Sequence, residues 1–326
     1  MADEGKPSTR EEQARRLAES MKRQLGPFCG LLAEPGLVEL MLNADGTVWA
    51  DRLGQGMNPV GIMPAASAES FIGTVASTLR SAVTRDSPIL ECELPAESPF
   101  DGSRFEALIP PVVSAPVFTV RRKASAVFPL EAYERQGIMS RGQRSAIEAA
   151  VAGRQNILVV GGTGTGKTTL TNAVIDHMVR AAPQHRLVII EDTSELQCSA
   201  RNAVVMRATD TVDMQRLLKA TMRLRPDRII VGEVRGGEAL SLLKAWNTGH
   251  PGGVCTVHAN HARAGLQRLE QLIAEVSQTP MRALIAEAVN LIVSVIKTDA
   301  APGRRIDEVM AVTGFADGNY RFVNAE

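Results

Sequence analysis

Gly161-Gly-Thr-Gly-Thr-Gly-Lys167-Thr168-Thr169 is the stretch of this 326-residue chain that decides its fold. It follows the apolar run Ile157-Leu-Val-Val160, which predicts a strand, and it precedes a helical pattern that continues to about Arg180. A glycine-rich loop between a strand and a helix predicts a phosphate-binding site, because its backbone N–H groups can surround phosphates at the N-terminus of the helix.

Every residue of the loop is assigned to nucleotide binding. Gly161, Gly164 and Gly166 are expected to allow tight, left-handed turns that a Cβ atom would obstruct. Lys167 would supply a positive charge to the β and γ phosphates of ATP, and the Thr168 hydroxyl would ligate Mg²⁺. The predicted nucleotide-binding set is Gly161, Gly162, Thr163, Gly164, Thr165, Gly166, Lys167, Thr168 and Thr169.

The sequence from residue 141 to residue 326 predicts an α/β domain with a doubly wound, mostly parallel sheet. Apolar runs recur at residues 187–190, 229–231, 254–257 and 291–296. Helical patterns alternate with these runs near the glycine loop, which is typical of a parallel sheet covered by helices.

Residues 1–123 predict a small α+β domain. Strands are expected at residues 38–42, 47–50, 105–109 and 117–120, and a helix at 65–83. The first two strands flank a Gly-containing turn in hairpin order. Residues 124–140 contain Pro129 and Gly137 and are expected to form a flexible linker to the second domain.

A charged helix is predicted near the amino terminus, ending at about Leu25. Its capping box would be formed by Ser8 with Glu11 or by Thr9 with Glu12. The side chains of Leu17, Met21 and Leu25 share one face among basic residues. This pattern fits a helix docked on its own domain, and it leaves a peripheral membrane anchor as an alternative.

Two carboxylates at the ends of predicted strands are candidates for catalysis. Glu233 ends the segment Arg228-Ile-Ile-Val-Gly-Glu233 and is expected to polarise the attacking water. Glu191 ends Ile189-Ile-Glu191 and is expected to organise water or the surroundings of the metal. Both lie at the carboxyl end of a parallel strand, where open α/β sheets gather their ligands.

A histidine-rich tract, from His250 to His261, follows these motifs. It lacks the paired Cys/His spacing of structural zinc sites. An imidazole, with His258 as the main candidate, together with Thr256 or Asn260, is instead expected to sense the γ-phosphate by hydrogen bonding differently to ATP and ADP.

Composition limits the class of protein. The 36 basic residues equal the 36 acidic residues, so the whole chain has no charge signature of nucleic-acid binding. The four cysteines are scattered, which favours a reducing compartment. With no apolar signal segment near Met1 and no apolar run of ~18 residues, we expect a cytoplasmic protein.

The ordered motifs together resemble those of the hexameric secretion ATPases. The glycine loop corresponds to Walker A, Glu191-Asp-Thr-Ser-Glu195-Leu to the Asp box, Arg225 through Gly236 to Walker B, and Thr248 through Asn260 to the His box. Segments upstream, including Leu37 to Asn43, are similar to the amino-terminal domain of that family. The branch that the chain resembles most is that of the type IV secretion and conjugation ATPases.

The resemblance implies a RecA-like P-loop NTPase domain behind the small α+β domain, with ATP and Mg²⁺ bound between the two. Arg104 and Arg121 or Arg122 would reach the phosphates from the first domain. The resemblance also implies a homohexamer in the cytoplasm, at the inner face of the inner membrane, in contact with components of the secretion channel.

Four alternatives compete with a conjugation motor. A type II secretion ATPase would carry a tetracysteine zinc insertion, which four scattered cysteines cannot form. A pilus-retraction ATPase would be expected to carry a longer carboxy-terminal helical region than the one that follows the last motif here. A RecA-like nucleic-acid motor is disfavoured by the neutral charge and by only two Trp and two Tyr residues, so direct nucleic-acid binding is not expected. A scaffold that binds ATP without turnover is disfavoured by Glu233 and the histidine tract.

Overall fold

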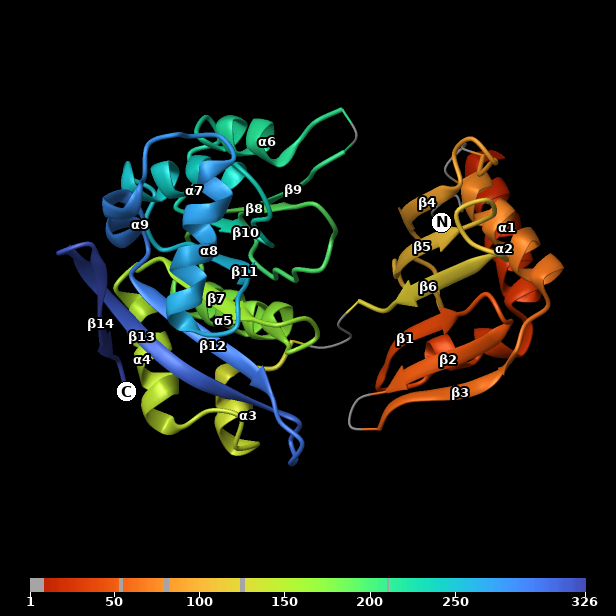
Figure 1. Ribbon diagram of the computed structural model, residues 1–326, viewed down its shortest axis with the longest axis horizontal. Coiled ribbons are helices and arrows are strands. Elements are labelled where there is room, and N and C mark those ends of the chain that lie inside the picture. The colour runs from red at the N-terminus through yellow and green to blue at the C-terminus, as the bar shows by residue number, and fades with distance from the viewer. Residues whose placement is uncertain (1–8, 53–54, 79–81, 124–126, 210) are drawn as a thin grey trace, which may run out of the picture. The chain divides into compact units, whose positions relative to one another are not determined.

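The structure, a computed structural model, describes residues 9–52, 55–78, 82–123, 127–209 and 211–326. It divides into two compact units, Met1–Ser125 (unit 1) and Ala126–Glu326 (unit 2), each described by itself below. Ser8, a candidate for the first helix cap, lies outside the described residues, as does the side chain of Thr9. Both units are mixtures of helices and strands (Figure 1).

Unit 1 is a mixed α/β unit whose described residues form a six-stranded sheet in the order β3-β2-β1-β6-β5-β4. Every pairing between neighbouring strands of this sheet is antiparallel. The helices are α1 (Thr9–Leu25) and α2 (Ala65–Thr78), with 3-10 turns at Gly26–Cys29 and Leu31–Ala33. The strands are β1 (Leu37–Leu42), β2 (Thr47–Arg52), β3 (Gly56–Ile62), β4 (Ile89–Glu93), β5 (Arg104–Leu108) and β6 (Val117–Arg121).

The apolar face of α1 is used inside unit 1. Met21 and Leu25 are fully buried, in one cluster with Phe71 of α2. The ring of Phe71 packs on those of Phe105 and Phe118, with centroids 5.6 and 5.3 Å away. The docked helix is therefore favoured over a membrane anchor, because two of the three residues of the α1 stripe are packed in the core. None of the helices in the described residues is both long enough and apolar enough to cross a bilayer.

Unit 2 carries an eight-stranded sheet, over the described residues, in the order β14-β13-β12-β7-β11-β10-β8-β9. The strands from β12 to β9 are parallel, and β13 and β14 are antiparallel additions at one side. The strands are β7 (Ile157–Gly161), β8 (Leu187–Glu191), β9 (Ala203–Arg207), β10 (Arg228–Val231), β11 (Val254–His258), β12 (Leu291–Lys297), β13 (Arg304–Ala316) and β14 (Asn319–Asn324). The helices are α3 (Leu130–Arg135), α4 (Arg141–Ala152), α5 (Lys167–Ala181), α6 (Met214–Thr221), α7 (Glu238–Asn247), α8 (Ala262–Ala274) and α9 (Arg282–Ala288).

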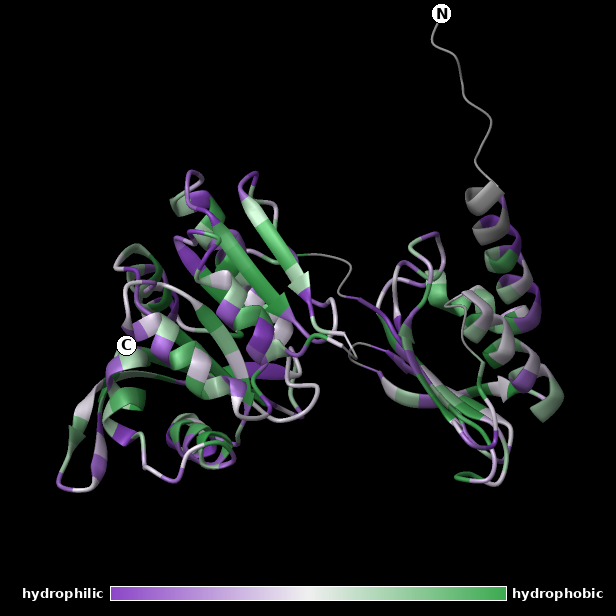
Figure 2. Cartoon of the chain, turned by 90° about the horizontal axis from the view of Figure 1, so that it is seen from above, coloured by the Kyte–Doolittle hydropathy of each residue, from purple (hydrophilic) through white to green (hydrophobic). Residues whose placement is uncertain are grey.

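Both faces of the central strands of this sheet are buried, as the doubly wound prediction requires. Along β7, Leu158 and Val160 face a core shared with α7, α8 and α9, whereas Ile157 and Val159 face a core shared with α3, α4 and α5. The strands at the centre of unit 2 are accordingly largely apolar, as the hydropathy colouring of Figure 2 shows. A strand buried on both faces needs a continuous apolar run rather than alternation.

Residues 130–139, which the sequence placed in a linker, are part of unit 2 instead. Leu130 and Tyr133 of α3, and Ile138 and Met139 after it, are buried in the same core as α4 and α5. Pro129 stands at the N-cap of α3, and its dihedral angle suits a helix start. Pro129 and Gly137 therefore flank a packed helix here and do not mark a flexible connection.

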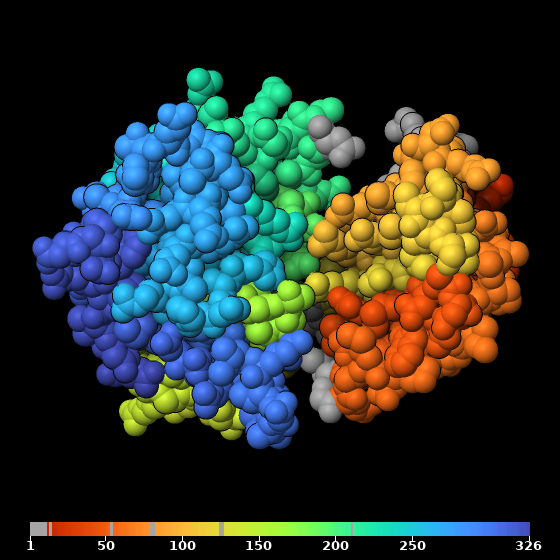
Figure 3. All heavy atoms as spheres, viewed as in Figure 1, coloured from red at the N-terminus to blue at the C-terminus, as the bar shows by residue number. Residues whose placement is uncertain are grey.

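The antiparallel strands β13 and β14 complete the sheet beyond β12. Their atoms appear in dark blue at one border of unit 2 in Figure 3. Ile306 and Val309 of β13 are buried in the core beside α4, so the addition is part of the packed unit. The last residue of β12, Lys297, and the first of β13, Arg304, lie beside the glycine loop.

Candidate functional site

The glycine loop joins β7 to α5, and its conformation explains two of its glycines. Gly164 and Gly166 have φ angles of 67° and 100°, in the left-handed region that favours glycine. Gly161 does not have a positive φ, so the prediction of a left-handed turn there is wrong. At that position glycine is needed for close packing, since a Cβ atom would lie 2.5 Å from the Val295 carbonyl oxygen.

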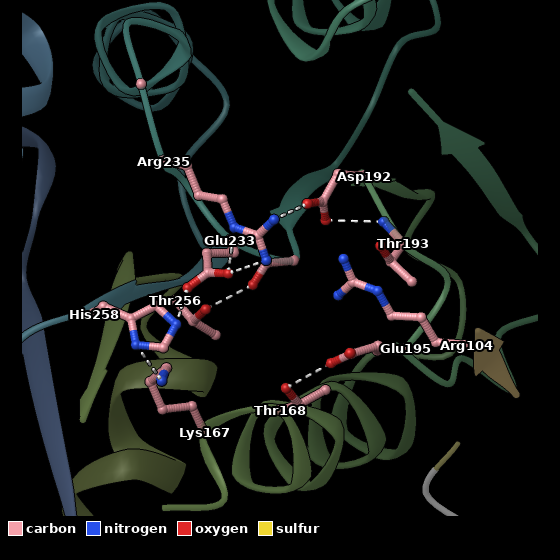
Figure 4. A network of polar contacts seen from close by, with 12 residues as sticks. Arg104, Lys167, Thr168, Asp192, Thr193, Glu195, Glu233, Arg235, Thr256 and His258 are labelled. Atoms are coloured by element: carbon pink, nitrogen blue, oxygen red, sulfur yellow. Dashed lines mark hydrogen bonds and ion pairs between the residues drawn. The ribbon is translucent and has the colours of Figure 1, made fainter. Parts of the chain in front are cut away.

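Lys167, the first residue of α5, is held across the mouth of the loop. Its side chain is largely buried, and Nζ donates a hydrogen bond of 2.9 Å to the Gly162 carbonyl oxygen. Nζ also lies 3.2 Å from Nδ1 of His258 (Figure 4). The structure therefore brings together two residues that are 91 positions apart, and both are on the predicted catalytic list.

His258 connects Lys167 to Glu233. An ammonium group can only donate, so Nδ1 of His258 accepts and the ring carries its proton on Nε2. Nε2 in turn lies 2.7 Å from Oε1 of Glu233. The parallel pairing of His258 with Gly161 in the sheet fixes the imidazole beside the loop. Glu233 thus contacts an imidazole that itself contacts Lys167, the lysine predicted to bind phosphate.

Arg235 holds the other side of the Glu233 carboxylate. Its Nε donates to Oε2 of Glu233 over 2.7 Å, and its Nη1 bonds to Asp192 (Figure 4). The Glu233 side chain is only 12% exposed, whereas that of Arg235 is 54% exposed. The hydrogen bond from Arg235 at Oε2 and the contact with His258 at Oε1 together restrict the orientation of this partly buried carboxylate, as a water-polarising group needs.

The Thr168 hydroxyl, the predicted Mg²⁺ ligand, faces a carboxylate from the loop after β8. Its Oγ1 donates to Oε2 of Glu195 over 3.1 Å. Asn172, one turn further along α5, donates to the Glu195 carbonyl oxygen and accepts from the Gln197 N–H. These two hydrogen bonds of the Asn172 side-chain amide hold the segment that carries Glu195 against α5.

Glu191 lies behind the segment that carries Glu195, and its predicted role in organising water or the surroundings of the metal stays a prediction. Its side chain is buried, and Oε1 accepts from the backbone N–H groups of Glu195 and Leu196 over 2.8 and 2.7 Å. A Cβ atom at Gly232 would lie 3.2 Å from its Cγ. Glu191 therefore shapes the segment that presents Glu195, and Glu195 is the acid that contacts the Thr168 hydroxyl.

Burial makes the carboxyl group of Glu191 a weaker acid than usual, which means that its pKa is raised. Desolvation raises the pKa of its carboxyl to about 7, although the two N–H groups favour the charged form. The folded protein thus keeps this proton up to about pH 7, whereas an unfolded chain releases it above its ordinary pKa near 4.5. Stability associated with this group is consequently highest at or below pH 4.5, falls as the pH rises to 7, and stays low above it.

A Glu191→Gln variant is expected to lose this pH dependence. The difference in free energy of unfolding, variant minus parent, should grow by up to about 3 kcal/mol as the pH rises from 5 to 8. This amount follows from the difference between the folded and unfolded pKa values of Glu191. Urea unfolding in a Trp49→Phe background measures it, because Trp246 then reports unit 2 alone. Parallel pH curves for the two proteins would contradict the assignment.

Comparison with known proteins identifies the family of the chain. Residues 69–308 match the family model described as type II/IV secretion system protein. The chain belongs to this family. It is 55% identical over 306 residues to a probable conjugal transfer protein TrbB of Sinorhizobium fredii and 53% identical over 307 residues to the conjugal transfer protein TrbB of Rhizobium radiobacter. Each alignment covers 94% of this chain and 92% of the relative, which confirms the predicted resemblance to conjugation proteins.

A solved structure supports the fold of this secretion-family chain. The ATPase DotB of Legionella pneumophila superposes with a TM-score of 0.61 at 17% identity. The match covers 95% of this chain and 83% of DotB, so it extends over both units.

The remaining histidines of the secretion-family tract lie away from the chain of contacts around His258. His250 precedes β11, at the opposite end of the strand, and its Nδ1 lies 3.2 Å from the Pro226 carbonyl oxygen. His261 caps α8 by accepting from the Ala264 N–H. Of the other two proposed sensors, Thr256 donates to the Gly232 carbonyl oxygen over 2.8 Å, and Asn260 is exposed after β11.

The three arginines proposed to reach the phosphates belong to unit 1. Each has an acidic partner within that unit, in the pairs Arg104–Glu91, Arg121–Glu39 and Arg122–Asp101. These pairs lie at 2.7, 3.5 and 3.5 Å, respectively. A role in phosphate binding stays a prediction for all three.

Sequence reasoning missed three side chains of the site. Asp192 and Glu195 were quoted only as parts of a motif, and Arg235 had no role. A signal existed for Arg235, since it follows Glu233 by two residues, and side chains two apart on an extended backbone point the same way. The contact of Glu195 with Thr168 had no such signal, because it depends on how the segment after β8 folds back on α5.

Proposed function

We propose that this chain is the ATP-hydrolysing subunit of a homohexameric motor that powers assembly of, or transfer through, a conjugative type IV secretion system. It would act in the cytoplasm, at the inner face of the inner membrane, on components of the secretion channel. The similarity to conjugal transfer proteins supports the assignment to a conjugative secretion system. The geometry of the site supports the proposed hydrolysis of ATP.

The observation that carries the proposed reaction is the continuous series of contacts Lys167–His258–Glu233–Arg235. It links the lysine of a phosphate-binding loop to an oriented carboxylate. A protein that only bound ATP would need the lysine and the loop but would have no use for this carboxylate. Turnover needs a base that can accept a proton from water.

The residues present fit ATP and Mg²⁺. Gly166, at the N-cap of the 15-residue helix α5, leaves the first-turn N–H groups without a side-chain cap. Such groups, at the positive end of a helix dipole, favour phosphate. The Thr168 hydroxyl and the Glu195 carboxylate supply oxygen atoms, the ligand type that Mg²⁺ prefers. When bound, Mg²⁺ neutralises charge on the phosphoryl group that is transferred.

The chain's own groups would divide the work of hydrolysis. Lys167 exchanges its bond with Gly162 for the phosphates and stabilises their negative charge. Glu233 accepts the proton of the attacking water, while His258 and Arg235 keep its two oxygens in place. The products are ADP and inorganic phosphate. His258 touches both Lys167 and Glu233, which suits it to respond to the γ-phosphate.

The finer fold assignment belongs to the same proposal. Unit 2 would be a RecA-like P-loop domain and unit 1 the amino-terminal domain, with the boundary near residue 123. Nucleotide would bind between them, with Arg104 and Arg121 or Arg122 reaching the phosphates. A guanidinium group is suited to this task because it stays charged and can form two parallel bonds to a phosphate.

Native mass spectrometry of the purified chain, with Mg²⁺ and with or without ATP, tests the ring, and phosphate release in the same samples tests the enzyme. We expect a species with the mass of six chains and measurable turnover. Turnover by a persistent monomer would contradict the ring but leave the ATPase. A hexamer that binds ATP without releasing phosphate would point to the scaffold alternative.

A further inference from the structure

The β12–β13 connection brings two cations to the glycine loop from the far end of the sequence. Lys297 is the last residue of β12 and Arg304 is the first of β13, and the two are directly paired across the antiparallel ladder. Strand β12 is itself paired in parallel with β7, the strand that leads into the glycine loop. The pairing of the strands therefore places both residues at the end of the sheet that carries the glycine loop.

Both cations lie against the two loop positions with left-handed backbone. A Cβ atom at Gly164 would lie 3.0 Å from Nζ and 3.3 Å from Cε of Lys297. At Gly166 it would lie 2.5 Å from Nη1 of Arg304 and 3.5 Å from its Cδ and Cζ. The glycines thus let charged ends of side chains approach the loop backbone more closely than another residue would allow.

The charge of these two residues has no acidic partner in the described part of the chain. None of the ion pairs found there includes Lys297 or Arg304. The adjacent Arg305 differs, since it pairs with Asp307 over 2.9 Å. Because β-strand residues alternate between faces, Arg304 and Arg305 point to opposite sides of the sheet.

Positive charges gathered here are unfavourable unless an anion joins them. Lys167, Lys297 and Arg304 all lie at the N-terminal end of α5, where the helix dipole is already positive. Repulsion among them is relieved when a polyphosphate enters, so the arrangement favours the nucleotide-bound state.

We propose that Lys297 and Arg304 form a second cationic contact for the phosphates of the bound nucleotide, in addition to Lys167. The inference rests on the proposed function and extends the binding site to the β12–β13 hairpin of the same chain. The two residues bind the polyphosphate group and not the base, so ATP and ADP both depend on them.

Isothermal titration calorimetry with Mg²⁺ and ATP or ADP tests this on the full chain. We expect Lys297→Gln and Arg304→Gln each to weaken binding of both nucleotides about tenfold, the ratio given by one charged hydrogen bond. Arg305→Gln is the matched control, since it removes the same charge one residue away, and it should bind within about twofold of the parent. Raising the salt concentration should narrow the difference between parent and variants.

Affinities of both variants equal to that of Arg305→Gln would overturn the inference. Loss of ATP binding in all three arginine and lysine variants alike would also overturn it, because the effect would then follow net charge and not position. If the Arg304 variant does not fold, the affinity of Lys297→Gln for nucleotide tests the inference by itself. Lys297 is exposed, so its replacement should leave the fold intact. Failure of the parent chain itself to bind ATP would instead refute the proposed function.

Discussion

Lys167→Ala is expected to abolish ATP turnover, with a loss of roughly 10³-fold or more in kcat. The ammonium group has two tasks here, because it carries the charge for the phosphates and supports His258 through the 3.2 Å contact with Nδ1. Removal of the side chain therefore weakens nucleotide binding and loosens the imidazole that orients Glu233. Phosphate release at saturating ATP measures the loss.

Lys244→Ala provides the matched control for this experiment. Lys244 is exposed on α7 and is also part of unit 2, so its removal changes net charge without touching the loop. We expect its turnover to equal that of the parent. Turnover near the parent level in the purified, folded Lys167→Ala protein would refute the motor proposal.

Glu233→Gln is expected to separate binding from chemistry. The glutamine oxygen can still accept from His258 or Arg235, so the site keeps its shape, but the group can no longer take a proton from water. Affinity for ATP should stay within a few-fold of the parent, while the hydrolysis step slows by roughly 10²- to 10⁴-fold. A single-turnover experiment with excess enzyme isolates that step from product release.

A comparison with Glu287→Gln controls for the loss of a negative charge. Glu287 lies on α9, where its carboxylate accepts from Asn247 at an exposed position, away from the loop. This variant should hydrolyse ATP at the parent rate. If Glu233→Gln matched it in single turnover, another group would have to serve as the base.

The parallel core of unit 2 could be predicted from sequence because its signal is local and strong. Strand β7 is an unbroken apolar run that is buried on both faces. The glycine-rich loop that follows it has a pattern typical of phosphate binding. The placement of Glu233 beside this loop also follows from a general rule, that carboxyl ends of parallel strands share one edge of the sheet.

The hairpin of β13 and β14 was missed for a physical reason. Much of β13 is only partly buried, so its pattern lacks a clear period of two, and its pairing partners are set by tertiary contacts. The same applies to residues 130–139, where proline and glycine occur inside a packed segment. Composition indicates a linker only when nothing buries the segment.

Side-chain contacts within the site were predictable only in part. Lys167 and Glu233 could be selected singly, yet their connection through His258 depends on the register of β11 against β7. Glu191 was selected by the same strand-end position, yet its side chain is turned into the protein, where it bonds the backbone of the segment that carries Glu195. Strand position fixes where a residue lies and leaves the direction of its side chain open.

Gly232 shows how densely this edge of the sheet is connected. Its N–H donates to the Ile190 carbonyl oxygen, its own carbonyl accepts from Thr256, and its missing side chain leaves room for Glu191. A side chain at this position would therefore press on Glu191 of the neighbouring strand, directly beside Glu233, the next residue in the chain. For laboratory evolution, a residue with no side chain of its own is therefore tied to two side chains on the neighbouring strands, those of Glu191 and Thr256.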